Sequence, residues 1–285
     1  MHTSPPLLRA FAAARALTFA ALAAVLLAAS GCDDRPAAAL TVKTDTPPPG
    51  PVAGSPWTLG LPNNAALEML PVAAGSFTMG DGTGHRVEIT KPYWLGKYEV
   101  TQAQWAAVMG SDPANFKGAQ FPVEQVSWHD AVEYCAKLTN QERAAGRLPA
   151  GYRYTLPTEA QWEYACRAGT TGNYGGSGNL NEMGWYGDNS GNKTHDVGGK
   201  SPNAWGFYDM HGNVLEWCAD WYGSYPSGSV TDPTGPNAGS DRVLRGGSWL
   251  SSSDYCRSAY RLYFDPGYRS LNFGFRVALA PAGAE

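Results

Sequence analysis

Every helix signal in this chain precedes Gly169, and the long stretch after it shows no helical periodicity. Before that point Thr101, Ser127 and Thr158 stand at N-cap positions, and the two threonines each have a Gln three residues later that completes a capping box. These caps predict helices over residues 102–109, 128–145 and 159–168. Beyond Gly169 we expect Gly/Asn-rich loop with short aromatic strands. The sequence therefore predicts an α+β domain with about three helices, short strands and much irregular loop.

The domain itself is expected to cover residues 61–281. Short strands around Gly turns are predicted at 72–80, 85–89 and 93–100, and another strand pattern occupies 272–279. No second linker interrupts this range. With 43% hydrophobic residues and ten tryptophans in 285 residues, the chain can bury a sizeable core.

Residues 1–31 resemble a bacterial lipoprotein signal peptide. Arg9 and Arg15 precede an apolar run at 16–29, which is too short to span a bilayer but suits the core of a signal peptide. The run ends in LAASGC at 27–32, which resembles a lipoprotein cleavage box, so Cys32 would carry the lipid. An ordinary secretory signal with an incidental cysteine is the alternative. We expect a protein of the bacterial cell envelope, periplasmic or surface-exposed, that contacts the membrane through its lipid anchor only.

The Pro-rich residues 32–60 show no apolar period and are predicted to form a semi-rigid tether. The whole chain carries a net charge of −4, which provides no electrostatic attraction for phosphate backbones. Nucleic acid is therefore not an expected partner.

Several motifs occur in the order typical of one family. They are GSFTMG at 75–80, EVT at 99–101, PVEQVSW at 122–128, RYTLPTEAQWE at 153–163, NAWGFYDMHGNVLEW at 203–217 and RVLRGGSW at 242–249. Together they resemble the formylglycine-generating, sulfatase-modifying-factor family. This resemblance implies a C-type-lectin-like fold of the formylglycine-generating subclass, with Ca²⁺ as a structural ion. The family contains oxidases, sulfoxide synthases and non-catalytic binding proteins, so the fold alone does not determine the function.

Family enzymes oxidise a cysteine of a client protein with two thiols that bind Cu(I), an ion that prefers soft thiolate ligands. The resemblance places this pair at positions 251 and 256. Cys256 is present, but position 251 is Ser251, whose hydroxyl is a poor Cu(I) ligand. The catalytic site is therefore incomplete and copper is not expected. Cys256 and Ser248 are the candidate site residues if the chain is an enzyme.

Four cysteines remain after Cys32, and in an exported protein they are candidates for disulfides. Four cysteines can form two disulfides in three different ways, and all three remain open. The pairing we favour is Cys218–Cys256 with Cys135–Cys166.

A calcium loop is predicted at residues 209–216, where two carboxylates flank a Gly/Asn turn. Ca²⁺ takes about six to eight oxygen ligands from carboxylates, carbonyls and water. The resemblance assigns the side chains of Asp209 and Glu216 and the carbonyls of Gly212 and Val214 as ligands. On spacing alone, a tight turn with solvated acids is the alternative.

Residues 249–275 have the composition of an antibody-like paratope. Eight of these 27 residues are aromatic and five are serine, with arginines interspersed. Regular alternation, which a buried strand pair would show, is absent from 250–264. The predicted ligand-contacting residues are Leu250, Ser251, Ser252, Tyr255, Tyr260, Leu262, Tyr263, Phe264, Tyr268, Ser270 and Leu271.

Leu, Ser, Tyr, Phe and Asp can all arise from an AAC asparagine codon by changing adenines alone. The segment therefore resembles the variable region of a protein diversified by a diversity-generating retroelement, several of which are lipoproteins with this fold. Drift in a relative that is not diversified is the alternative.

Three functions follow from these expectations. The first is a lipid-anchored envelope protein whose lectin-like fold displays a variable surface, residues 250–273, to an unknown protein or surface ligand. The second is a periplasmic oxidoreductase of the sulfatase-modifying-factor type, acting on a cysteine or another substrate. The third is a non-catalytic structural module of a larger envelope assembly.

Overall fold

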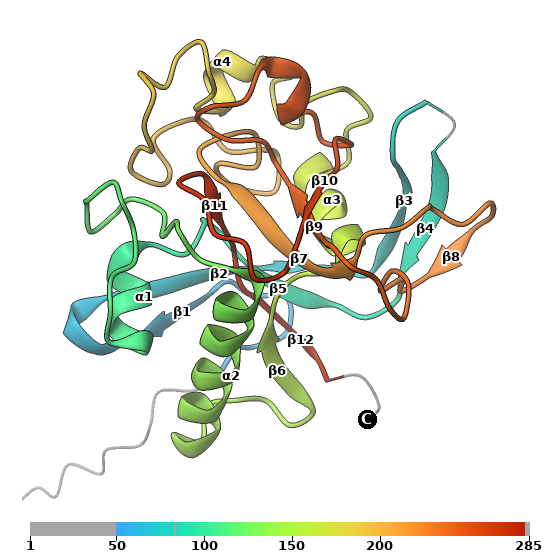
Figure 1. Cartoon of the computed structure of the whole chain (residues 1–285). Coiled ribbons are helices and arrows are strands. Elements are labelled where there is room, and N and C mark those ends of the chain that lie inside the picture. Colours follow the sequence, from blue (N-terminus) through green and yellow to red (C-terminus); the bar gives the residue numbers. More distant parts are fainter. Residues whose placement is uncertain (1–49, 83, 283–285) are drawn as a thin grey trace, which may run out of the picture. The chain divides into compact units, whose positions relative to one another are not determined.

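The computed structural model describes residues 50–82 and 84–282 (Figure 1). The predicted signal peptide at 1–31, Cys32 and the tether as far as residue 49 lie outside the described residues. Among the helices that the structure describes, none is long and apolar enough to cross a membrane.

A five-stranded antiparallel sheet brings the two ends of the domain together, in the order β1-β2-β5-β12-β6 (Figure 1). The last strand lies inside the sheet, where Leu279 is paired with both Trp94 and Tyr154. Leu59 in the first strand is buried, so the final residues of the predicted tether belong to the domain. The strands are β1 (Trp57–Gly60), β2 (Ala66–Val72), β5 (Tyr93–Gly96), β6 (Tyr152–Thr155) and β12 (Ala278–Pro281).

The three predicted helices are present, and each begins at its predicted cap. They are α1 (Gln102–Met109), α2 (Trp128–Ala144) and α3 (Glu159–Arg167). All three have complete capping boxes, and α2 completes its box with Asp130. A fourth helix, α4 (Leu180–Met183), was not predicted. It is a single turn, which is too short to show a helical period, so the expectation of no helix beyond Gly169 was wrong here.

Two smaller sheets flank the central one. The first has the order β10-β9-β7-β11, and residues 246–272 form its strand β10 and the connections on either side of it; the second has the order β3-β4-β8. β10 was not predicted, because three residues are too few to show the alternation of a strand. The strands are β7 (Leu215–Trp221), β9 (Arg242–Arg245), β10 (Leu262–Phe264), β11 (Phe273–Gly274), β3 (Gly75–Met79), β4 (His85–Ile89) and β8 (Val230–Thr231), and two 3₁₀ turns are η1 (Pro62–Asn64) and η2 (Ser253–Cys256).

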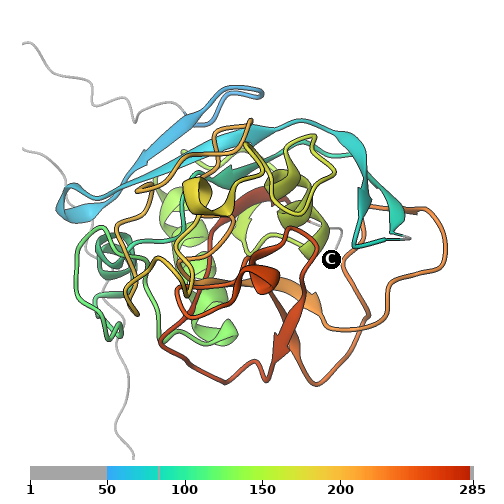
Figure 2. The same cartoon turned by 90° about the horizontal axis from the view of Figure 1, so that it is seen from above.

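The core is divided into two main clusters. The first contains the stacked pair Trp105 and Tyr134, whose ring centres are 5.7 Å apart, with Phe275 against both rings. The second surrounds Trp162 of α3. Helices α2 and α3 are thus fixed by their buried faces. Seen from above, the red C-terminal part of the chain runs along one edge of the domain, and its last strand, β12, lies in the interior (Figure 2).

Candidate ligand-binding surface

Large apolar and aromatic side chains gather on the C-terminal segment. Eight such side chains are exposed among the described residues, and five of them lie between residues 250 and 271. These five are 36% to 60% exposed: Leu250, Tyr255, Tyr263, Tyr268 and Leu271. None of the eleven predicted contact residues is buried. The side chains therefore reach the surface, which the predicted function requires.

The exposed and half-buried rings of this region are in contact in pairs. Tyr222 stacks on Tyr263 with ring centres 4.1 Å apart, Tyr255 lies 4.8 Å from Tyr260, and Phe264 stacks on Tyr268 at 4.9 Å. Stacked rings restrain one another and keep a broad apolar area in place. We call these six residues together the aromatic platform.

Tyr222 was missed by sequence reasoning because it lies almost thirty residues before the predicted segment. Its amide donates to the carbonyl of Asp241 at 2.8 Å, which extends the pairing of β7 with β9. Tyr263 lies on the other side of β9, opposite Val243. No spacing in the sequence could have revealed this neighbour, because the sheet order creates it.

The remaining predicted contacts divide into free and engaged side chains. Ser252 is exposed, whereas the Ser251 hydroxyl accepts from the amide of Ser248 at 2.9 Å. Ser270 donates to Asn272 Oδ1 at 2.6 Å. Leu262 and Phe264 are half buried and pack on the first core cluster. Ser252 and the exposed rings are thus the side chains most available to a ligand.

Arginines fasten the segment to the two helices beneath it. Arg261 makes a two-pronged ion pair with Glu159 in the first turn of α3. Arg269 makes another with Asp130 in the first turn of α2, at 2.8 and 2.7 Å. Bidentate arginine–carboxylate pairs fix orientation as well as distance. The two ion pairs therefore hold the segment that carries the platform in a fixed position on α2 and α3.

A third arginine, Arg245 of β9, supports the segment from inside. It is fully buried, pairs with Glu163 of α3, and donates to the backbone carbonyls of Ser258 and Tyr260. Glu163 also accepts from Arg167 at 2.8 Å, so two guanidinium groups share this carboxylate. Each buried charge of this network has a partner, so the loss of one member would leave another charge uncompensated.

The oxidase candidates are placed unfavourably for copper chemistry. Burial raises the pKa of the Cys256 thiol to about 12, so the sulfur is protonated at neutral pH. The Ser248 hydroxyl contacts Ser251 Oγ at 3.1 Å and accepts from Asn272 at 3.1 Å, and no histidine of the described residues hydrogen-bonds to it. A buried thiol beside a serine does not fit Cu(I), which needs thiolate ligands.

The favoured disulfide pairs are not formed. Cys135, Cys166, Cys218 and Cys256 are all free thiols in the structure. Cys135 lies in the first core cluster, Cys166 and Cys218 lie in the second, and Cys256 packs with Leu180 and Tyr186. Each favoured partner therefore sits in a different part of the core, which the number of cysteines alone could not reveal.

His211 connects the backbone beneath the platform. Its Nε2 accepts from the amide of Gly175 at 2.9 Å, so Nδ1 carries the proton and donates to the carbonyl of Cys256 at 2.8 Å. Burial lowers the pKa of His211 to about 4. The neutral imidazole therefore acts as a bridge that holds the end of η2.

The residues proposed for calcium lie in a buried acidic turn. Gly212 has φ +121°, and a Cβ there would meet the carbonyl of Trp185 at 2.1 Å, so the turn requires glycine. Asp209 Oδ2 accepts from the amide of Gly198, while Oδ1 is buried with no hydrogen-bond partner in the described residues. An orphaned carboxylate oxygen of this kind fits a cation.

Glu216 fits the calcium assignment less well, because Arg276 binds both of its oxygens at 2.6 and 2.7 Å and Trp162 donates to one of them. The nearby Glu99 is also buried, and burial followed by the charges of Asp209 and Glu216 raises its pKa. In the part of the chain that the structure describes, no three His, Cys, Asp or Glu side chains converge on one metal position. A cation here would depend on Asp209 and on backbone carbonyls.

The fold and this surface define the class of the protein. It is a formylglycine-generating-enzyme-like domain with a C-type-lectin-like arrangement of short strands, helices and loops. The profile of the sulfatase-modifying factor enzyme 1-like domain matches residues 60–281, and the chain belongs to this family.

Three similar proteins illustrate the range of the family. The chaperone protein LppX of Paenibacillus barcinonensis is 33% identical over 258 residues, which cover 74% of this chain and 88% of that protein. The mouse formylglycine-generating enzyme is 36% identical over 213 residues, but the match spans only 53% of that enzyme. Treponema denticola variable protein 1 superposes with a TM-score of 0.73 at 34% identity, covering 79% of this chain and 99% of that chain.

Proposed function

We propose that this chain is a lipid-anchored binding protein of the bacterial cell envelope, and that residues 250–273 form its ligand-contacting surface. The observation that carries the proposal is the concentration of exposed rings on a firmly supported segment. Five of the eight large exposed hydrophobic side chains of the described residues lie there. A contiguous exposed apolar area with polar neighbours is typical of a recognition surface.

The similar proteins are named for different roles: one is named a chaperone, one a variable protein and one an enzyme. The preference for binding over catalysis therefore rests on the site of this chain. The oxidase alternative would use Cys256 and Ser248, but the buried thiol and the hydroxyl of Ser251 provide no copper pair. Titration with Cu(I) together with an oxygen-uptake assay tests this alternative. Stoichiometric copper binding with turnover would establish the enzyme and overturn the proposal.

Binding is tested by removing rings whose loss leaves the frame intact. Tyr263→Ala combined with Tyr268→Ala is expected to abolish capture of a polypeptide or surface ligand by the purified domain. Trp205→Ala is the matched control, because Trp205 is also an exposed aromatic side chain and packs on Tyr164 away from the platform. Partners retained equally by both variants would instead favour a structural module.

Diversification of the surface is part of the proposal and has a genetic test. The coding sequence would lie beside a reverse transcriptase gene and a near-identical repeat that differs from it only at adenines. Sequences from related strains would vary at the eleven contact positions and stay constant at Arg261 and Arg269, which make the supporting ion pairs. A complete genome without the repeat and the reverse transcriptase would remove diversification.

The lipid anchor is proposed at Cys32. Labelling of cells with a fatty-acid analogue is expected to modify the protein, and Cys32→Ser is expected to abolish the label and release the domain from membranes. Persistence of the label in this variant would show that Cys32 is not the lipidated residue.

Calcium is proposed as a structural ion held by Asp209 and the carbonyls of Gly212 and Val214, with Glu216 at the margin. A bound cation would supply positive charge where Glu99, Asp209 and Glu216 share the single guanidinium of Arg276.

A further inference from the structure

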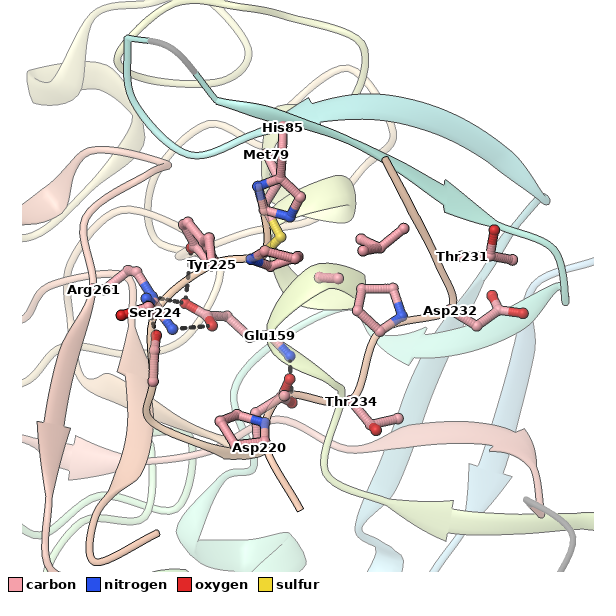
Figure 3. A pocket seen from close by; sticks show the side chains of 17 residues that line it. Met79, His85, Glu159, Asp220, Ser224, Tyr225, Thr231, Asp232, Thr234 and Arg261 are labelled. Atoms are coloured by element: carbon pink, nitrogen blue, oxygen red, sulfur yellow. Dashed lines mark hydrogen bonds and ion pairs between the residues drawn. The ribbon is translucent and has the colours of Figure 1, made fainter. Parts of the chain in front are cut away.

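A pocket of about 560 Å³ opens beside the platform, a volume in the usual range for small-ligand sites of roughly 300–1,000 Å³. Figure 3 shows Glu159, Tyr225 and Arg261 on one side, Asp232 and Thr234 on the other, and Asp220 below. The walls also include three prolines from the segment between β7 and β9, which are Pro226, Pro233 and Pro236. Prolines stiffen a wall because their φ angles are fixed.

The charges around this pocket are unequal. Glu159 is neutralised by Arg261 and also contacts Arg245 at 3.2 Å. Asp220 and Asp232 form no ion pair with any Lys, Arg or His of the described residues. Both oxygens of Asp232 instead accept from Thr90, Oδ1 from its amide at 2.8 Å and Oδ2 from its hydroxyl. Two of the three lining carboxylates thus lack a cation.

Asp220 is the exceptional member. Asp220 is only 4% exposed. Among the other described residues, one donates a hydrogen bond to its carboxylate: the amide of Glu159 donates to Oδ2 at 2.8 Å. Burial and the nearby charge of Glu159 raise the pKa of Asp220 to about 7. A buried carboxylate without a counter-ion is unfavourable, and a cation entering the pocket would relieve that cost.

The pocket is continuous with the platform through Arg261. This residue lines the pocket and stacks over Tyr225 at 4.0 Å and over Tyr222 at 4.6 Å. Tyr222 in turn stacks on Tyr263. A polypeptide lying on the platform could therefore extend one side chain into the pocket.

We propose that this pocket binds the cationic side chain of a lysine or arginine in a polypeptide ligand, with Asp220 as its counter-ion. The inference rests on the proposed function, because it specifies the chemistry of the ligand that would also cover the platform. The apolar walls would contact the aliphatic stem of the side chain, while Asp220 would receive its charged end.

The test uses the full chain and two small probes, N-acetyl-lysine methylamide and its uncharged analogue N-acetyl-norleucine methylamide. The lysine probe is expected to bind at least about tenfold more tightly, a difference of about 1.4 kcal/mol. Asp220→Asn, which keeps the acceptor for the amide of Glu159, is expected to abolish this preference. Asp254→Asn is the matched control, because Asp254 is an exposed acid outside the pocket.

If Asp220→Asn fails to fold, Thr234→Phe provides a second variant at an exposed pocket residue, and it is expected to reduce binding of the lysine probe by blocking the entrance. Equal binding of the two probes, or an unchanged preference in Asp220→Asn, would overturn the inference. Tyr263→Ala is expected to keep the preference, because Tyr263 does not line the pocket. Failure of the pocket can thus be distinguished from failure of the platform.

Discussion

Arg261 donates two parallel hydrogen bonds to Glu159, from Nε to Oε1 at 2.6 Å and from Nη2 to Oε2 at 2.7 Å. The Arg261 side chain is 15% exposed and that of Glu159 is 4% exposed. Arg261 immediately precedes β10, and Glu159 begins α3, so this pair joins the platform to a helix that is fixed in the second core cluster.

The first prediction compares this pair with its exposed counterpart. Glu159→Gln is expected to lower the free energy of unfolding by about 3 to 5 kcal/mol, because it leaves a largely buried guanidinium without its partner. Arg269→Gln breaks the pair with Asp130, in which Arg269 is 54% exposed, and is expected to cost at most about 1 kcal/mol. Urea denaturation measures both. Equal losses of unfolding free energy in the two variants would contradict the expectation that the more buried ion pair contributes more to stability.

The second prediction concerns acid. The pKa of His211 is lowered from 6.5 to about 4, so its neutral form is favoured in the folded state. The resulting stability is fully present above pH 6.5 and is lost as the pH falls towards 4, amounting to about 3 kcal/mol at most. His211→Gln is expected to be less stable at neutral pH, and its free energy of unfolding is expected to fall less steeply as the pH decreases. Free energies of unfolding measured across this pH range check the slope.

The effect of His211 has to be measured by comparing variants, because titration of Asp220 changes the free energy of unfolding with pH in the opposite direction. Its folded-state pKa is raised to about 7, so its contribution is present at low pH and is lost as the pH rises from about 4 to 7. His129→Gln, at an exposed site, is the control for His211→Gln. An identical pH slope in both variants would show that His211 titrates normally.

The third prediction concerns the thiols. Cys135, Cys166, Cys218 and Cys256 are buried and free, so a thiol reagent is expected to react with them only after unfolding. Mass spectrometry without reductant is expected to find all four labelled after denaturation. Detection of two disulfides in the native protein would contradict this prediction and would support the disulfide pairing expected from the sequence.

The fourth prediction addresses calcium. Added Ca²⁺ is expected to raise the melting temperature of the chelator-treated protein, since an ion that binds only the folded state stabilises it. Asp209→Asn is expected to remove this shift because it alters the orphaned carboxylate. Asp188→Asn, at an exposed residue, provides the control. A shift that survives in Asp209→Asn would place the ion elsewhere.

The helices were the most predictable part of the fold, because caps such as Thr101 with Gln104 act within four residues. The exposure of Tyr255, Tyr263 and Tyr268 also agrees with their sequence context, since a paratope-like composition does not alternate as a buried strand does. These features depend on neighbours along the chain, and sequence reasoning could reach them.

What sequence reasoning missed depends on residues that are distant along the chain. Tyr222 joins the platform only because β7 and β10 both pair with β9. Asp220 becomes a pocket residue only because α3 begins above it. Arg276 and Glu216 are 60 residues apart in the chain, and their ion pair occupies one of the carboxylates that the sequence assigned to calcium. Such contacts require the topology, which local patterns do not specify.

Arg245 attaches to the outer segment through the carbonyl oxygens of Ser258 and Tyr260. Carbonyl oxygens belong to the main chain and are the same whichever amino acid occupies a position. Exchange of side chains at neighbouring positions would therefore leave the acceptors of Arg245 in place. The hold of Arg245 on this segment depends on the path of the main chain and not on which side chains the segment displays.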